Sequence, residues 1–262
     1  MIKNIYIELT EKFNDGRLRA VICSGQAAVL HKIAIMSKDG DWIIKEDQEC
    51  LSHIISILEK YRAVYRFGAP LDIRWLKGGW SSHFEFMHGN IRVRTDFFTR
   101  PPRLSPEMLE QLWIESEGKH PPFTNMLLLA EMKKTNREKD YAIIGELARR
   151  MKNPQDVFLY SRSARDIVEH ADSFPKILAE IKYKRELLSK LPCSTDELEK
   201  ELDAERRKLM HANEERLSKY GVLSEKWADK WPLVQSLTCG RPLTEAHGII
   251  IKSAEGILPC TP

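Results

Sequence analysis

The chain has 262 residues, 42% of them hydrophobic and 30% charged, and its formal net charge at pH 7 is +3. This length accommodates one large domain or two smaller ones, and the composition is that of a globular protein rather than a disordered one. A net charge this small does not by itself indicate a nucleic-acid-binding protein.

The five cysteines are widely scattered and include no Cys-x-x-Cys pair, which argues against a disulfide framework or a zinc site. Residues 1–13 lack the apolar core and the small cleavage-site residues of a secretory signal. No apolar run approaches the ~20 residues that span a bilayer. These features predict a cytoplasmic protein without a membrane partner.

Two aspartates next to a small-residue turn are the most informative feature of the N-terminal region. The apolar run Ala20–Cys23 predicts a buried strand, and Ser24–Gly25 opens a helix whose unpaired N–H groups favour an anion. A second predicted strand, Trp42–Lys45, is entered through Asp39 and Asp41. Strand residues two apart point to the same side, so these carboxylates can ligate one divalent cation or bridge two, as in phosphoryl or nucleotidyl transfer. The competing interpretation is an ordinary Asp-Gly turn.

Further along, the pattern predicts a helix and a set of strands. Residues 46–61 have the apolar spacing of an amphipathic helix. Residues 71–76 and 81–87 are predicted as strands joined by a glycine turn, and residues 91–98 alternate like a half-buried strand. The polar face of this last strand carries Arg92, Arg94 and Asp96. Basic residues outnumber acidic ones from Lys60 to Arg103, which suits a triphosphate or RNA as well as ordinary solvated charges.

The rest of the chain is predicted to be mainly helical. Ser105 and Pro106 are an N-cap and first-turn pair for a helix running to about Glu115. Residues 125–151 are predicted as helical, divided near Thr135–Asn136, followed by long charged helices over residues 164–191 and 194–220. Ser194 and Glu197 form a capping-box pattern for the second of these. The tail, residues 231–262, receives no assignment.

Four basic residues, Lys133, Lys134, Arg137 and Lys139, lie within two helical turns. Spacings of three and four residues let Arg137 share a helix face with either lysine, and such a face can hold phosphates or simply be solvated. The sequence spacing shows no Ser/His/Asp triad, P-loop or Rossmann fingerprint.

Two segments together resemble a known family. The segment from Ser24-Gly25 through Ser37-Lys38-Asp39-Gly40-Asp41 resembles the turn, helix and Thr-x-Asp-x-Asp motif of the nucleotidyltransferase superfamily with the DNA polymerase β fold. Ser37 takes the threonine place, and Gly40 stands where the family usually has an apolar residue. The segment Leu129–Asp140 resembles the family's helical Lys…Arg-x-Lys-Asp signature. The chain is most similar to small bacterial proteins of this group, which include abortive-infection toxin enzymes.

The resemblance implies a metal site and a nucleotide site. Asp39 and Asp41 would hold Mg²⁺ or Mn²⁺ with a third carboxylate from a later strand: Asp96 first, then Glu85, then Asp72. The alternative for Asp96 is an ion pair with a neighbouring arginine. The implied nucleotide-binding residues are Ser24, Gly25, Ser37, Lys133, Lys134, Arg137 and Lys139.

The predicted architecture is therefore α+β (α/β-like), with a nucleotidyltransferase mixed sheet and flanking helices. Residues 1–104 form the predicted catalytic core, residues 105–152 complete the nucleotide site, and residues 153–262 are a mainly helical region. The implied activity moves a nucleoside monophosphate from a nucleoside triphosphate to a hydroxyl of RNA, tRNA or protein, releasing pyrophosphate. The alternative is an inactive nucleotide- or RNA-binding or interaction module in a toxin–antitoxin or phage-defence pair.

Overall fold

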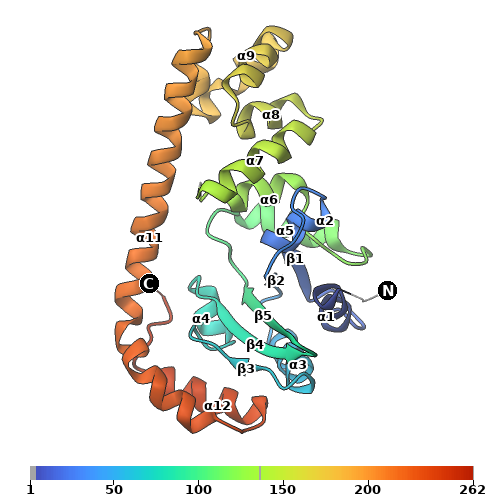
Figure 1. Cartoon of the computed structure of the whole chain (residues 1–262), viewed down its shortest axis with the longest axis vertical. Helices are drawn as coiled ribbons and strands as arrows, with labels where there is room; N and C mark the ends of the chain where they lie inside the picture. The colour runs from blue at the N-terminus through green and yellow to red at the C-terminus, as the bar shows by residue number, and fades with distance from the viewer. Residues whose placement is uncertain (1–3, 136, 262) are drawn as a thin grey trace. The chain divides into compact units, whose positions relative to one another are not determined.

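The computed structural model describes residues 4–135 and 137–261. It is a mixed α/β structure in which a five-stranded mixed sheet is accompanied by many helices (Figure 1). The predicted α+β class is confirmed at this level, whereas the specific nucleotidyltransferase layout stays a prediction. Residues 1–3, Asn136 and Pro262, on which parts of the predicted domains and of the second motif fall, lie outside the described residues.

The sheet-bearing half of the chain alternates strands with short helices. Its elements are α1 (Ile5–Phe13), β1 (Ala20–Cys23), α2 (Ser24–Leu30), β2 (Asp39–Ile44), α3 (Gln48–Lys60), β3 (Val64–Tyr65), α4 (Ile73–Lys77), β4 (Ser82–His88), β5 (Ile91–Phe98) and α5 (Pro106–Ser116). The helical half follows. Its elements are α6 (Met126–Lys133), α7 (Glu138–Arg150), α8 (Pro154–Tyr160), α9 (Ala164–Ser173), α10 (Pro175–Ile181), η1 (Lys182–Lys184), η2 (Glu186–Lys190), α11 (Thr195–Thr238) and α12 (Leu243–Ala254).

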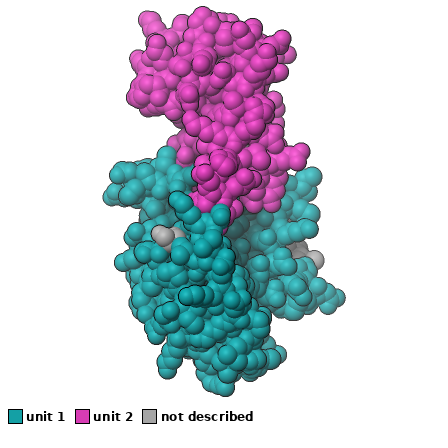
Figure 2. All heavy atoms as spheres, turned by 90° about the vertical axis from the view of Figure 1, so that its left-hand side faces the viewer, with its two compact units in different colours: residues 1–124, 218–262 teal, residues 125–217 magenta. Residues whose placement is uncertain are grey.

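The chain divides into two compact units (Figure 2). Unit 1 comprises Met1–Thr124 and Ser218–Pro262, and unit 2 comprises Asn125–Leu217. The predicted segments 105–152 and 153–262 are thus each divided between the units. The C-terminal part of α11 and all of α12 belong to the same unit as the sheet.

The sheet of unit 1 has the strand order β1-β2-β5-β4-β3. The central pair, β2 and β5, is parallel, and the other neighbours are antiparallel. On one face, Trp42 of β2 stacks on Phe97 of β5 with ring centroids 5.4 Å apart, and Phe13 of α1 meets both rings edge-on. Buried aromatic pairs of this kind add to the stabilisation that comes from the apolar area removed from water. This apolar face leaves the opposite face of the same strands for charged residues.

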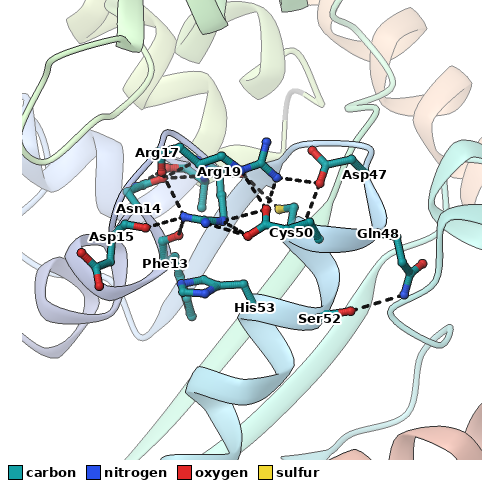
Figure 3. A network of polar contacts seen from close by, with 12 residues as sticks. Phe13, Asn14, Asp15, Arg17, Arg19, Asp47, Gln48, Cys50, Ser52 and His53 are labelled. Carbon is teal, nitrogen blue, oxygen red and sulfur yellow. Dashed lines mark hydrogen bonds and ion pairs between the residues drawn. The ribbon is translucent and has the colours of Figure 1, made fainter.

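A buried arginine fixes the turn between α1 and β1 to the start of α3 (Figure 3). Arg19 is 7% exposed, and its guanidinium donates to the Asp15 carbonyl at 2.6 Å and to the Glu49 carboxylate at 2.6 Å. Asp47 caps α3 by accepting from the Cys50 N–H at 2.8 Å, and it also accepts from Arg17 at 2.6 Å. The pKa of Glu49 is lowered to about 2, chiefly by its hydrogen bond from Arg19. The network therefore stabilises the entry to the strand that precedes the Ser24–Gly25 turn.

The prediction of a strand over residues 71–76 is wrong. Residues Ile73–Lys77 form helix α4, because the Asp72 side chain caps it by accepting from the Arg74 N–H at 2.9 Å. Trp75 and Leu76 are both buried, which a strand with one solvated face would not allow. Asp72 is consequently a helix cap and not a strand carboxylate.

The C-terminal segment packs on the sheet-bearing unit through tryptophan hydrogen bonds. The indole N–H of Trp75 donates to the Leu258 carbonyl at 3.0 Å, and that of Trp80 donates to the Pro259 carbonyl at 2.9 Å. The indole N–H of Trp227, on α11, donates to the Gly68 carbonyl at 2.9 Å. The tail that received no assignment is thus part of the fold of unit 1.

Unit 2 is helical, but its helices differ from the predicted ones. The predicted helix over residues 164–191 is broken into α9, α10 and two 3₁₀ turns, with Pro175 opening α10. The capping box is confirmed: the Ser194 N–H donates to the Glu197 carboxylate at 2.9 Å, and the Glu197 N–H donates to the Ser194 hydroxyl at 3.3 Å. The helix it starts, α11, runs past the predicted end at residue 220 to Thr238. Of the helices in the described ranges, none is both long and apolar enough to cross a membrane.

Candidate functional site

Strands β2 and β5 place three predicted carboxylates on one face of the sheet. Asp41 is the register partner of Asp96, and Asp39 is the register partner of Arg94. Neighbouring strands lie about 4.8 Å apart, and register partners in a sheet project to the same face. Trp42 and Phe97 lie on the opposite, apolar face. The sheet thus brings Asp39, Asp41 and Asp96 to a common polar face, hereafter the carboxylate face.

Asp39 has an unusual hydrogen-bonding state. Its side chain is 42% exposed, yet its Oδ1 atom is buried and accepts no hydrogen bond from the described residues. The nearby Arg94 Nη1 atom lies 4.0 Å from that oxygen. Burial, together with the charges of Asp39 and Asp41, raises the pKa of Tyr6, whose hydroxyl donates to the Lys38 carbonyl at 2.7 Å. An orphaned carboxylate oxygen of this kind is the type of atom that a bound cation satisfies.

Asp96 and Glu85, the first two choices for the third carboxylate, both contact arginines. The Oδ1 atom of Asp96 accepts from His83 Nδ1 at 2.8 Å and lies 3.4 Å from Arg66 Nη1. Glu85, on β4, lies 3.9 Å from the Nε atom of Arg66 and 4.0 Å from that of Arg94. The ion pair proposed as the alternative for Asp96 is therefore present. The contacts of Asp96 with described residues use Oδ1, so Oδ2 is the atom that remains for a metal ion.

Ser81 and His83 form a chain of polar contacts that ends at Asp96. Ser81 Oγ lies 3.1 Å from His83 Nε2, and His83 Nδ1 lies 2.8 Å from Asp96 Oδ1. The tautomer with the proton on Nδ1 lets the ring donate to Asp96 and accept from Ser81. This connectivity of nucleophile, base and orienting carboxylate is the one that activates a serine.

The sequence spacing did not predict this arrangement, because it depends on the pairing of β4 with β5. Ser81, just before β4, and His83, within it, are two residues apart, as are residues that point to the same side of an extended chain. Asp96 lies opposite His83 in the β4–β5 register. Counting equal distances from the Gly89–Asn90 turn would have found this pair, since a hairpin turn fixes the register of its strands.

The turn after β1 contacts the segment that leads into β2. A β-carbon on Gly25 would lie only 2.2 Å from Ser37 Oγ, and the Ser37 hydroxyl donates to the Asp39 carbonyl at 3.1 Å. The Gln26 side chain also donates to the Ser37 carbonyl at 3.1 Å. Ser24 has a φ of +52°, a left-handed conformation that is uncommon for a residue with a side chain. The residues of the first motif therefore lie together at the start of β2.

Packing explains the glycine at position 40, between the two aspartates. A β-carbon there would lie 2.4 Å from the Trp42 ring and 2.5 Å from the Tyr6 ring. The two aromatic side chains thus occupy the space that an apolar side chain would need. Glycine at this position is therefore explained by packing on the apolar face of the sheet and not by the chemistry of the carboxylate face.

The second motif, in unit 2, is organised by a buried aspartate. Asp140 is fully buried and accepts from Lys133 Nζ at 2.8 Å, from the Thr135 hydroxyl at 2.6 Å and from Arg137 Nε at 2.7 Å. Burial alone would raise the pKa of Asp140, but these donors hold it below its usual value. The charge of Lys133, which is 7% exposed, is thus compensated within the unit. Lys134 pairs with Glu131 at 2.7 Å, and Lys139 is exposed.

A cavity of about 580 Å³ in unit 1 opens beside Asp39. Its lining includes Ser37, the basic residues Lys38, Arg92 and Arg94, and the aromatic ring of Tyr6. This volume is within the range of small-molecule sites, about 300–1,000 Å³. Cationic side chains next to a carboxylate suit a phosphorylated ligand.

The side chains of the carboxylate face meet part of the requirements of a Mg²⁺ site. Within the described residues, no three His, Cys, Asp or Glu side chains converge in a metal-binding geometry. Mg²⁺ often takes only one or two protein carboxylates, completing its octahedron with water and substrate phosphates. Asp39, with its orphaned oxygen, and Asp41 meet that smaller requirement, with Asp96 beside them.

Compared with protein-family models, with curated proteins and with solved structures, the chain matches none of them. The nucleotidyltransferase resemblance thus receives no support from relatives.

Proposed function

We propose that the chain is a metal-dependent nucleotidyltransferase that moves a nucleoside monophosphate from a nucleoside triphosphate to an acceptor hydroxyl. The observation that carries the proposal is the pairing of Asp41 with Asp96 across parallel strands, with Asp39 two residues earlier on the same strand. The cavity beside Asp39 supplies room for a nucleotide. The acceptor is RNA, including tRNA, or a protein side chain.

The reaction is an in-line displacement at the α-phosphorus. The acceptor oxygen bonds to this phosphorus while the bond to pyrophosphate breaks, and the acceptor proton leaves to solvent or a nearby base. When bound at Asp39 and Asp41, Mg²⁺ or Mn²⁺ neutralises charge on the phosphate oxygens. Arg94, with its guanidinium beside Asp39, supplies a fork that matches a phosphate, and Lys38 adds a point charge from the cavity wall. Catalysis in this scheme comes from positioning and charge neutralisation.

The test is transfer of label by the full chain. We expect α-labelled triphosphate, supplied as each of the four nucleotides with Mg²⁺ or Mn²⁺, to label total RNA or protein. Asp41→Asn should lower the rate at least about 100-fold, since it removes a charge that acts in the transition state. Asp15→Asn is the matched control, because Asp15 is an exposed aspartate outside the carboxylate face. Equal rates for the two variants, or no labelled polymer with the wild type, would contradict the proposal.

The inactive-module alternative makes a different prediction. Such a protein would bind nucleotide equally well with and without divalent ion, and Asp39→Ala/Asp41→Ala would leave the affinity unchanged. A nucleotidyltransferase would instead lose Mg²⁺-dependent binding in that variant.

The Ser81–His83–Asp96 arrangement supports a second candidate, a serine-nucleophile transferase or hydrolase. In this reaction Ser81 Oγ bonds to a carbonyl carbon or a phosphorus, His83 Nε2 takes the hydroxyl proton, and the leaving group departs with the bond electrons. A fluorophosphonate reagent tests it without any nucleotide, because its phosphorus bonds to an activated serine as fluoride leaves. We expect one label per chain, located on Ser81 by peptide mass spectrometry and at least about tenfold slower in His83→Gln. Labelling of exposed Ser52 at the same rate as Ser81 would rule this candidate out.

A further inference from the structure

Unit 2 contains a second cavity, of about 470 Å³, whose wall is rich in basic side chains. It lies among residues of α8, the 3₁₀ turns and the N-terminal half of α11. The basic residues in its wall are Lys134, Arg162, Lys184, Arg185 and Lys208. Three glutamates, Glu186, Glu201 and Glu205, also line it, so the wall has a net charge of +2. None of these residues belongs to the carboxylate face.

Two of the arginines are almost completely buried and depend on one carboxylate. The Arg162 and Arg185 side chains are 4% and 5% exposed. Arg185 binds both oxygens of Glu205, at 2.8 Å and 2.7 Å, while Arg162 Nη1 reaches the same carboxylate at 3.2 Å. Arg185 also donates to the Phe158 carbonyl at 2.7 Å. Both guanidinium groups are therefore paired with the same carboxylate.

Arg162 is the less compensated member of the pair. Its Nε atom is buried and has no hydrogen-bond partner among the residues that the structure describes. The Tyr141 ring, 5.6 Å from its guanidinium, offers only a cation–π contact. Burial, reinforced by the neighbouring Arg185, lowers the pKa of Arg162 to about 10. A buried charge without a full partner is costly, so an anion entering the cavity would be stabilised.

The apolar residues in the cavity wall indicate which class of anion the cavity can bind. Leu159, Leu187 and Leu209 give the cavity an apolar surface that inorganic phosphate would not use. The volume is within the usual range of small-molecule sites, and guanidinium forks match phosphate geometry better than point charges do. A dianion would also neutralise the net charge of the wall.

We propose that this cavity binds a small organic phosphate of nucleotide size, with Arg162 and Arg185 at its phosphate group and the leucines against its carbon skeleton. The exposed Lys184 and Lys208 extend the positive charge to the mouth of the cavity. Because Glu186 pairs with Lys208 at 3.1 Å, an incoming phosphate competes with that glutamate for the lysine.

Isothermal titration calorimetry of the full chain tests this proposal. The protein carries Asp39→Asn and Asp41→Asn and is kept in chelator, so that metal-dependent binding in unit 1 does not contribute. The probes are adenosine 5′-monophosphate, inorganic phosphate and unphosphorylated adenosine. We expect one monophosphate per chain, bound more tightly than inorganic phosphate, and no binding of adenosine.

Two variants locate the binding. Lys184→Ala/Lys208→Ala should weaken monophosphate binding at least about tenfold, because charged contacts to phosphate are each worth more than a neutral hydrogen bond. Lys176→Ala/Lys190→Ala is the matched control, since it removes two exposed lysines of unit 2 that do not line the cavity. Ala204→Trp, at an exposed position in the cavity wall, should block binding while the circular dichroism spectrum stays unchanged.

Three outcomes of these titrations would overturn the proposal. They are no binding of the monophosphate, equal weakening in both lysine pairs, or full binding in Ala204→Trp. Tight binding of RNA or an acidic peptide that depends on Lys184 and Lys208, without monophosphate binding, would also overturn it. Because the measurement uses neither metal nor intact Asp39 and Asp41, it can fail or succeed independently of the proposed transferase activity.

Discussion

At the residue scale, two glycines lie where a neighbouring side chain fills the space of a β-carbon. Ser37 occupies that space at Gly25, and Trp42 with Tyr6 occupies it at Gly40. The reason for glycine is therefore close packing rather than a positive φ, which the structure reports for neither position. These contacts hold the turn after β1 and the start of β2 in place beside the carboxylates.

Gly25→Ala tests this packing. Alanine favours a helix over glycine by about 1 kcal/mol, so the substitution in α2 would stabilise the protein if the space were open. We expect it instead to lower the free energy of unfolding by about 1–3 kcal/mol, because the new methyl group overlaps Ser37. Urea unfolding followed by tryptophan fluorescence measures the change.

Gly248→Ala is the matched control, because Gly248 lies in α12 with nothing within 4 Å of its would-be β-carbon. It should be neutral or stabilising. Adding Ser37→Gly to Gly25→Ala should restore stability through a coupling between the two sites. An unchanged effect of Gly25→Ala in the double variant would show that the contact with Ser37 is not the cause.

At the scale of elements, Asp140 joins the end of α6 to the start of α7. It accepts from Lys133 on α6, from Thr135 in the connection and from Arg137 at the N-cap of α7. The short helix pair thus depends on a buried charge network as well as on apolar burial of Leu129 and Leu147. Lys133 and Arg137 of the second motif consequently have a structural role, whether or not they also contact phosphate.

Asp140→Asn should lower the stability of this helix pair by about 3 kcal/mol, because it leaves the Lys133 charge buried without its carboxylate. The pKa of Asp140 is lowered in the folded protein, so its contribution is present above the ordinary carboxyl pKa of about 4. That contribution disappears as the pH falls below about 4 and the folded-state pKa is passed. Hydrogen exchange of the α6 and α7 amides measures the difference.

The control is Lys139→Gln, at an exposed position in the same motif, which should change stability by less than about 0.5 kcal/mol. On acidification, the α6 and α7 amides of Asp140→Asn should lose less protection from hydrogen exchange than those of the wild type. If both proteins lose protection equally below pH 4, Asp140 is not the group responsible.

At the scale of the whole chain, residues at opposite ends of the sequence form unit 1. The carbonyls of Leu258 and Pro259 accept from Trp75 and Trp80, and the Tyr220 hydroxyl donates to the Gly78 carbonyl at 3.1 Å. Leu258 is itself buried. The C-terminal segment therefore supplies the hydrogen-bond acceptors for Trp75 and Trp80 of the sheet-bearing unit.

Removing residues 257–262 should lower the stability of unit 1 by about 3–5 kcal/mol, from the lost burial of Leu258 and of the two indole rings and from the loss of their two hydrogen bonds. The intrinsic tryptophan emission should shift to longer wavelength as these rings meet water. Thermal unfolding followed by that emission checks both effects. Gly78→Ala should also lower the stability of unit 1, because a β-carbon there would overlap the Cys260 carbonyl. An unaltered emission spectrum in the truncated chain would contradict this account.

Local patterns determined much of this protein. Period-two alternation predicted β5 and the shared face of Arg94 and Asp96, and Ser105 and Ser194 marked the starts of α5 and α11. These signals are carried by residues a few positions apart, so no tertiary information is needed to interpret them. The strand predicted over residues 71–76 failed because a single capping contact from Asp72 outweighed the apolar pattern.

Only the tertiary structure decided what the carboxylates meet. The pairing of Asp41 with Asp96 depends on which strands are neighbours, and the contact of Asp96 with His83 depends on hairpin register. The burial of Arg162 and Arg185 around Glu205 depends likewise on the packing of helices and 3₁₀ turns far apart in sequence. The sequence determines which chemical groups the side chains carry. The charge environment of those groups arises from long-range packing, which no local pattern encodes.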